Sequence, residues 1–450
     1  MRRSIQRRDV LRGAGVAGLA AIAGCATEEA DDGADDTGTA DDADDIDADD
    51  VPDAVMVVGF PQSGIQLFRD YYSEFADATP DMDIIVPDGL IDDGLPGEVD
   101  NDMNNVIGTN PSAAGPGAEF YADAYEDAYD ESPGVFTAQA YDAMAINVLA
   151  TVAAGENTGS EIRDRVRTVT NPGGEEFGPE TLVEAVEAVA AGDRIRYVGA
   201  SSSTDFDING DIVTAAYDIV DFQDGELTTI DTVEFGSELT EEDEAAPAED
   251  PVGVDDGFEA RVGVLLPETG DLGPLGVPIR DGALLAADQI NDADIGVSVD
   301  VSVEDTQTDP QAGISGANSL VDAGYSSIVG PAASNVNFQV TDQVLIPNGV
   351  VGISPSSTAP GVTDLDDDGY IFRTAASDVL QGPAMADLAM SDQVGANSTG
   401  TLYLNDDYGQ ALEEEYINSF EGAGGDVRER VSFEPEQASY SSQWGDVLGL

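Results

Sequence analysis

Residues 260–291 read ARVGVLLPETGDLGPLGVPIRDGALLAADQIN and contain two patterns in succession. The apolar run Ala260–Leu266 is short and rich in valine and leucine, which is typical of a buried strand. A turn rich in glycine and proline follows it, and Gly282–Asn291 then has the apolar spacing of a helix. Because this order of strand and helix recurs along the chain, the sequence predicts an α/β fold with parallel sheets.

The other predicted elements continue this alternation. Strands are expected at 55–58, 83–86, 299–304, 327–329, 350–353 and 399–404, and hairpin-like strands between the turn DFDINGD (205–211) and Phe235. Helices are expected at 63–75, 136–154, 181–191, 314–323, 336–346 and 409–421.

Acidic residues dominate the composition of the 450-residue chain. It has 91 Asp and Glu against 16 basic residues, all of them Arg, and its formal net charge is −75. The apolar fraction of 41% is still sufficient for a folded core. Salt at about 1 M screens charges beyond about 3 Å, so a carboxylate-covered surface is tolerable there. The pattern resembles that of proteins from extreme halophiles.

The missing residue types exclude several classes of function. Without His or Lys, the chain has no Ser-His-Asp triad, no His-ligated zinc and no P-loop lysine. Nucleic acid is not an expected partner, because phosphate binding needs clustered basic residues. The single Cys excludes an internal disulfide. No motif pairs a nucleophile with a base, so an enzyme is not expected, and neither is a cofactor or a metal site.

The N-terminal residues have the pattern of an export signal. In 1–25, five Arg precede a short apolar run from Gly13 to Gly24. The stretch SIQRRDVL resembles a twin-arginine signal with Arg7 and Arg8 as the pair, and IAGC resembles a lipobox that ends at Cys25. Residues 26–50 are dense in Asp and predict a solvated, disordered tether. Together these features predict a lipid-anchored protein on the extracellular face of the membrane.

Two segments of the remaining chain resemble a known family, the leucine/isoleucine/valine-type solute-binding proteins of ABC importers. Residues 259–450 resemble its N-terminal half through VGVLLPETGDLGPLG, GALLAADQIN, IVGPAAS, ISPSSTAP, FRTAASDVLQGPAMA and LNDDYGQAL. Residues 51–235 resemble its C-terminal half through PDAVMVVGF, DIIVPDGL, FTAQAYDAM and RYVGASSSTDFDINGD. The resemblance implies a type 1 periplasmic-binding-protein fold, with two Rossmann-like lobes joined by crossover strands.

The two halves stand in reverse order, which predicts a circular permutation. The acidic, proline-containing linker 236–258 would join the original termini as a flexible coil that reaches roughly 25 Å. One lobe would then use about 131–204 and 259–378, and the other about 51–130, 205–235 and 379–450. The alternative is a rearranged gene or a fragment of a tandem array, whose product would not assemble the second lobe.

The resemblance also implies a set of ligand-binding residues. Ser334 with its neighbouring N–H groups would hold a ligand carboxylate, and Ser356 and Thr358 would contact the carboxylate and ammonium groups. Asp88 would face the ammonium, and Tyr408 would contact the ligand from the second lobe. Each also has an ordinary structural interpretation: the hydroxyls as helix caps or turn residues, Asp88 as an Asp-Gly turn and Tyr408 as packing.

Phe60 and Leu275 stand where the family often has aromatic residues that line the pocket. The implied ligand is therefore a branched-chain amino acid, another amino acid, or a short amide such as urea. The expected function is a receptor that is a monomer and delivers its ligand to an ABC permease in the membrane. An extracellular sensor with the same fold is the alternative.

Overall fold

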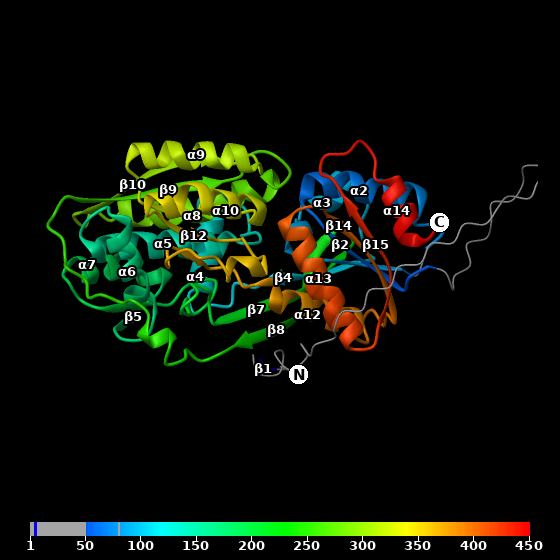
Figure 1. Ribbon diagram of the computed structural model, residues 1–450, viewed down its shortest axis with the longest axis horizontal. Helices are drawn as coiled ribbons and strands as arrows, with labels where there is room; N and C mark the ends of the chain where they lie inside the picture. Colours follow the sequence, from blue (N-terminus) through cyan, green and yellow to red (C-terminus); the bar gives the residue numbers. More distant parts are fainter. Residues whose placement is uncertain (1–3, 7–50, 80–81) are drawn as a thin grey trace, which may run out of the picture.

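The computed structural model describes residues 4–6, 51–79 and 82–450. Figure 1 shows two lobes side by side, each built around one large sheet. The first lobe contains the five-stranded sheet and the second lobe contains the eight-stranded sheet. The predicted signal with Arg7, Arg8 and Cys25, and the tether 26–50, lie outside the described residues.

All neighbouring strands of the first lobe's sheet run parallel. Their order is β10 (Val297–Asp305), β9 (Phe258–Leu266), β11 (Ser327–Val329), β12 (Val351–Ser354) and β13 (Ile371–Arg373). Every residue of β11 and β12 is buried. Such continuous apolar runs are what parallel strands covered on both faces require.

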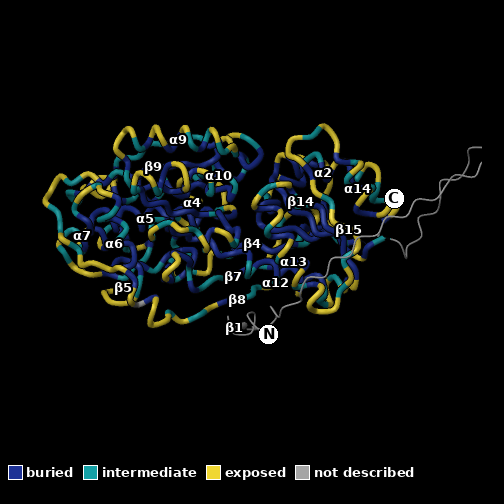
Figure 2. The backbone as a smooth tube through the Cα atoms, in the orientation of Figure 1, coloured by how far each residue is buried: buried dark blue, intermediate teal, exposed yellow. Residues whose placement is uncertain are grey.

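Helix α5 (Thr137–Ala154) forms the centre of the first lobe, and all of its residues are buried. It packs against β9, β11 and β12 and against three helices, which are α6 (Gly159–Thr170), α7 (Leu182–Ala190) and α8 (Gly273–Asn291). Figure 2 shows this helix inside a shell of more exposed segments. The first lobe is completed by α4 (Ala118–Tyr129), α9 (Pro310–Ala323), α10 (Ser334–Val340) with its continuation to Asn348, and the short pair β5 (Glu175–Phe177) and β6 (Ile195–Tyr197).

Segments from both ends of the described chain form the second lobe's sheet. Its order is β1 (Ser4–Gln6), β8 (Glu226–Gly236), β7 (Thr214–Gln223), β4 (Val106–Pro111), β3 (Asp83–Val86), β2 (Ala54–Val58), β14 (Ser398–Leu404) and β15 (Asp426–Phe433). β2 is fully buried and pairs in parallel with β3 on one side and β14 on the other. The pairings of β7 with β4 and with β8 are antiparallel.

Hydrogen bonds tie these distant segments together beyond the strand pairing. The Asp53 carboxylate accepts from the backbone N–H groups of Asn397 (2.8 Å) and Ser398 (2.9 Å). The Trp444 indole N–H, in α14 (Ser441–Leu448), donates over 2.8 Å to the Leu67 carbonyl in α2 (Pro61–Glu74). The short helix α3 (Leu95–Val99) and the helices α12 (Asp378–Ala389) and α13 (Asp407–Gly422) complete the lobe.

Residues 236–258 lie against the helices of the first lobe. The N–H groups of Glu249, Val252 and Val254 donate to the carbonyls of Asp164 in α6, Ala153 in α5 and Ala190 in α7, over 2.8, 3.0 and 2.9 Å. The segment also contains a short 3-10 turn, Asp243–Ala245. The linker is therefore held to the lobe and does not extend as a flexible coil.

The predicted elements are present, and most bounds differ from the prediction by a few residues. Helix α8 begins at Gly273, whereas the sequence predicted its start at Gly282. The difference arises because Pro274 lies in its first turn, and because Pro278 is accommodated inside the helix. Five helices and six strands of the described part were not predicted, which are α3, α4, α6, α12, α14, β1, β4, β5, β6, β13 and β15.

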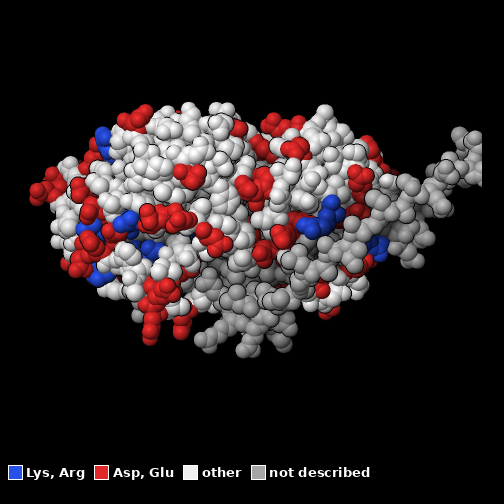
Figure 3. Space-filling view, in the orientation of Figure 1, with Lys and Arg blue, Asp and Glu red and all other residues white. Residues whose placement is uncertain are grey.

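Figure 3 shows clusters of carboxylates scattered over this face, with the few arginines close to them. Within the described residues, no helix combines the length and the apolar character that crossing a membrane requires.

Candidate ligand-binding site

A cavity of about 300 Å³ lies between the two lobes. Both lobes contribute to its wall, which consists of Phe60, Asp88, Gly89, Phe136, Leu272, Leu275, Ile279, Ala332, Ala333, Ser334, Ser356 and Tyr408. Six of the seven predicted ligand-binding residues are in this set. The seventh, Thr358, is fully buried two positions beyond Ser356 but is not part of the wall.

The first lobe supplies hydroxyl groups from the loops that follow β11 and β12. Ser334 begins α10, and its Oγ accepts from the Ala359 N–H (3.3 Å) and the Ser357 hydroxyl (3.4 Å). The side-chain oxygens of Ser356 and Thr358 are buried and have no hydrogen-bond partner among the described residues. Buried hydroxyls without partners are uncommon, so these two are available to a bound polar group.

The second lobe supplies a carboxylate and an aromatic pair. Asp88 follows β3 and is buried, and the Tyr408 hydroxyl donates to its Oδ1 over 3.4 Å. Burial raises the pKa of Asp88 to about 6, although the Gln381 amide and the Tyr408 hydroxyl act in the opposite direction. The rings of Phe60 and Tyr408 are stacked, with centroids 5.3 Å apart. Phe60 thus contributes apolar area and Asp88 a negative charge.

Gly89 is required by the close approach of the chain at this point. A Cβ atom built on it would lie 2.4 Å from the Gly59 carbonyl oxygen and 3.0 Å from the Tyr408 hydroxyl. Both distances are too short for a non-bonded carbon, so a side chain here would displace the segments that present Phe60 and Asp88.

Sequence reasoning missed a second buried carboxylate beside this site. Asp378 begins α12 and is fully buried, and neither of its carboxylate oxygens has a partner in the described part of the chain. Burial raises the pKa of Asp378 well above its usual value, and the nearby charge of Asp88 raises it further. The stretch SDVLQG contains this residue, but one Asp among 91 acidic residues gives no signal of its own.

Arg373 holds the loop that carries the site hydroxyls. Its guanidinium donates to the carbonyls of Ser357, Thr358 and Ala359 over 3.2, 3.0 and 3.0 Å. The same group is paired with Asp211 and with the Thr363 hydroxyl. Each of its three nitrogens therefore donates within the protein, and its charge partly offsets the rise in the pKa of Asp378.

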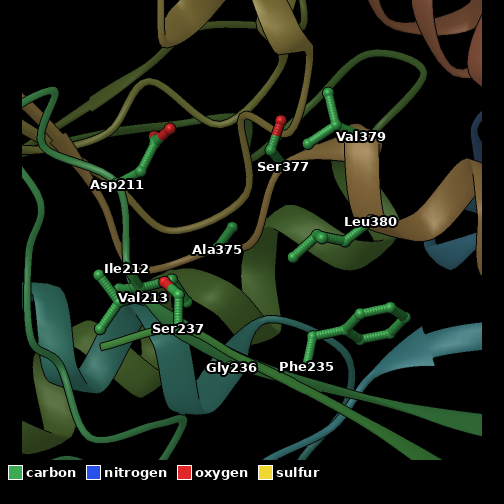
Figure 4. Close-up of a pocket in the computed structure, with 10 residues that line it drawn as sticks. All are labelled: Asp211, Ile212, Val213, Phe235, Gly236, Ser237, Ala375, Ser377, Val379 and Leu380. Atoms are coloured by element: carbon green, nitrogen blue, oxygen red, sulfur yellow. The ribbon is translucent and has the colours of Figure 1, made fainter. Parts of the chain in front are cut away.

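A second cavity, of about 530 Å³, lies where three segments pass between the lobes (Figure 4). These segments contribute Asp211–Val213, Phe235–Ser237, and Ala375 with Ser377. The wall is mainly apolar, and the Asp211 carboxylate is already engaged with Arg373. This cavity consequently lacks the charged groups that a zwitterion requires, and the first cavity is the candidate site. Among the described residues, no cluster of three or more possible metal ligands is present.

Comparisons with known proteins match the C-terminal part of the chain. Residues 259–448 match the family described as periplasmic binding protein. The leucine-, isoleucine-, valine-, threonine- and alanine-binding protein of Pseudomonas aeruginosa is 32% identical over 168 residues, which are 36% of this chain and 44% of that protein. The Leu/Ile/Val-binding protein BraC3 of Rhizobium johnstonii is 36% identical over 107 residues, 23% of this chain and 29% of that protein. The chain thus spans less than half the length of these relatives.

Two solved structures are similar over a comparable share. The leucine binding protein LivK of Thermotoga maritima has 26% identity and a TM-score of 0.36, and covers 41% of this chain and 51% of its own. The LivJ protein of Streptococcus pneumoniae in complex with isoleucine has 26% identity and a TM-score of 0.38, and the match covers 42% of this chain and 54% of LivJ. Residues 259–448 are therefore similar to periplasmic binding proteins, among them proteins named for the binding of leucine, isoleucine and valine.

Proposed function

We propose that this protein is the extracellular, lipid-anchored substrate-binding protein of an ABC importer, and that it binds an amino acid between its lobes. One observation carries the proposal, namely that a single interlobe cavity is lined by Ser334, Ser356, Asp88 and Tyr408.

The chemistry of the wall favours a zwitterion with an apolar side chain. The carboxylate of the ligand would lie at Ser334 and the adjacent N–H groups, where the continuous helical segment 334–348 begins. Its ammonium would lie between Asp88 and Asp378, with the Thr358 hydroxyl as a further acceptor. Two buried carboxylates without a paired cation are costly, and a bound ammonium would offset that cost. Phe60, Leu275 and Ile279 would contact the side chain.

We also propose that the two lobes correspond to the two halves of the family fold in circularly permuted order. The pairing of β2 with β14 supports this, since it joins the start of one half to the end of the other. The linker 236–258 supports it as well. Its hydrogen bonds to α5, α6 and α7 give the segment that would join the original termini a defined position on the first lobe. The lobes would comprise about 118–204 with 259–378, and about 51–117 with 205–235 and 379–450. The boundary predicted near residue 130 moves to about 117, because Tyr125 and Tyr129 of α4 donate hydrogen bonds to carbonyls of α8 in the first lobe.

Titration calorimetry in multimolar KCl, against a panel of amino acids and short amides, tests the binding function. Saturable binding of leucine, isoleucine or valine, accompanied by a cooperative thermal melt, is the expected result. A cooperative melt without binding of any amino acid would refute the amino-acid assignment. A protein that shows no cooperative melt in any salt would refute the permuted fold and indicate a rearranged gene.

A further inference from the structure

The residue at the N-cap position of helix α2, in the second lobe, does not cap the helix. This residue is Phe60, whose side chain makes no capping hydrogen bond, and Pro61 occupies the first helical position. The first N–H groups of a helix need acceptors from outside the helix, and Ser, Thr, Asp or Asn usually supplies one. At this position the chain has a phenylalanine whose side chain lines the ligand cavity instead.

The missing acceptor comes from the other lobe. Asp271 lies between β9 and α8 of the first lobe, and its Oδ1 accepts from the Ser63 backbone N–H (2.7 Å) and the Ser63 hydroxyl (2.8 Å). The Gln62 N–H also donates to the Asp271 carbonyl, over 3.3 Å. Asp271 therefore occupies the place of an N-cap while belonging to a different lobe.

These contacts lie at the rim of the cavity. Phe60, three positions before Ser63, and Leu272, directly after Asp271, both line it. Asp271 and Ser63 are 5% and 1% exposed, so water does not compete strongly for their hydrogen bonds. A negative charge at the N-terminus of a 14-residue helix is also favourable. The two partners belong to different lobes, so a separation of the lobes would break these hydrogen bonds.

We propose that Asp271 is a positioning residue that caps α2 across the cleft and thereby sets the lifetime of the closed state. The proposal rests on the proposed function, in which closure of the lobes retains the ligand. When the lobes open, the Ser63 N–H loses its acceptor and the first turn of α2 is uncapped. Opening is therefore opposed by a group that does not line the cavity.

The test compares Asp271→Ala, Asp271→Asn and a matched control, Asp309→Ala. Asp309 caps α9 within one lobe, where its side chain accepts from the Ala312 N–H over 2.8 Å. Two labels, one in each lobe of the full chain, report the interlobe distance by energy transfer, without ligand and with leucine. Stopped-flow mixing of the same samples gives the rate at which leucine dissociates.

Asp271→Ala is expected to lower the closed fraction and to raise the dissociation rate on the order of tenfold, the factor that about 1.4 kcal/mol produces. Asp271→Asn should stay near the wild type, because Asn caps nearly as well as Asp. Asp309→Ala should lower the melting temperature and leave closure unchanged. An equal effect of Asp271→Ala and Asp309→Ala on closure would overturn the proposal.

The energy-transfer measurement separates this proposal from the proposed function. If leucine fails to bind the wild type, the amino-acid assignment fails, but the closed fraction without ligand still reports on the contact. If the protein binds leucine normally and Asp271→Ala leaves the closed fraction unchanged, the proposed role of Asp271 as an interlobe cap is refuted and the receptor function is not affected.

Discussion

The Nε atom of Arg373 lies 2.6 Å from Oδ1 of Asp211, and this buried ion pair connects the last strand of the first lobe with a segment that leads to the second. Because the same guanidinium holds the carbonyls of Ser357–Ala359, it links the ligand cavity to the region where the chain passes between lobes. Replacement of a buried partner leaves an uncompensated charge, which typically costs about 3–5 kcal/mol.

Arg373→Ala should therefore lower the free energy of unfolding by about 3–5 kcal/mol. Chemical denaturation at constant high salt measures it. Glu176→Ala is the matched control, because it removes an exposed partner of Arg196 and should cost less than about 1 kcal/mol. Similar losses in the two variants would contradict the structural role of Arg373.

Ligand affinity should fall as the pH drops through about 6. Burial raises the pKa of Asp88 to about 6, so in the empty site this carboxyl takes up a proton near that pH. A ligand ammonium requires the ionised form, and below the pKa the proton competes with the ligand by at most about tenfold per pH unit. Titrations of leucine between about pH 5 and pH 8 measure this. Asp88→Asn should bind weakly throughout and should lose the part of the pH dependence that comes from Asp88.

Asp378→Asn should weaken the binding of ligands that carry an ammonium group while the protein remains folded. Burial and the nearby charge of Asp88 raise the pKa of Asp378, so its ionised form is disfavoured in the empty protein and a neutral Asn costs little there. The melting temperature without ligand should rise or stay constant, and the dissociation constant for leucine should increase. An unchanged dissociation constant would place the ammonium elsewhere.

Potassium chloride should stabilise the fold. The net charge of −75 creates a repulsion that salt screens, with a screening length near 10 Å at about 0.1 M and near 3 Å at about 1 M. The melting temperature should rise steadily across this range. Sucrose, which favours compact states without screening charge, serves as the comparison, and an equal rise with sucrose would argue against charge repulsion as the cause.

Export and anchoring remain predictions from the N-terminal sequence. Cys25→Ala should abolish incorporation of labelled lipid and release the protein into the medium. Arg7→Ala combined with Arg8→Ala should instead retain it inside the cell. Fractionation followed by immunodetection distinguishes these outcomes, and a lipid-labelled Cys25→Ala protein would rule out the proposed anchor.

The sequence predicted elements whose apolar pattern is simple and missed those in which another pattern dominates. β2 and β3 are short apolar runs, and α5 has a long one, so all three were found. β15 reads DVRERVSF and is largely exposed, so it resembles a charged loop. α12 contains Gly382 and Pro383, which usually end a helix, yet it continues to Ala389 because its buried side chains hold it in place.

The structure brings together the predicted residues that follow a recognisable strand, whereas no sequence pattern indicated the residues that only packing brings beside the cavity. Ser334, Ser356 and Asp88 stand directly after β11, β12 and β3, at the ends of strands where α/β folds place ligands. Asp378 and Asp271 are single acidic residues in a chain that contains 91 Asp and Glu. Their importance comes from burial and from neighbours distant in sequence, which the order of residues does not reveal.

The hydrogen bond between Asp53 and Ser398 joins positions that are 345 residues apart, and it lies beside the pairing of β2 with β14. Ribosomes add about 5–20 residues per second, so about 20–70 s pass between the synthesis of β2 and the synthesis of β14. The first lobe's sheet comes from the single stretch 258–373 and does not face this delay. The nascent chain therefore carries an incomplete sheet with an open edge for most of its synthesis, and chaperones that bind exposed strands have their main opportunity in that interval.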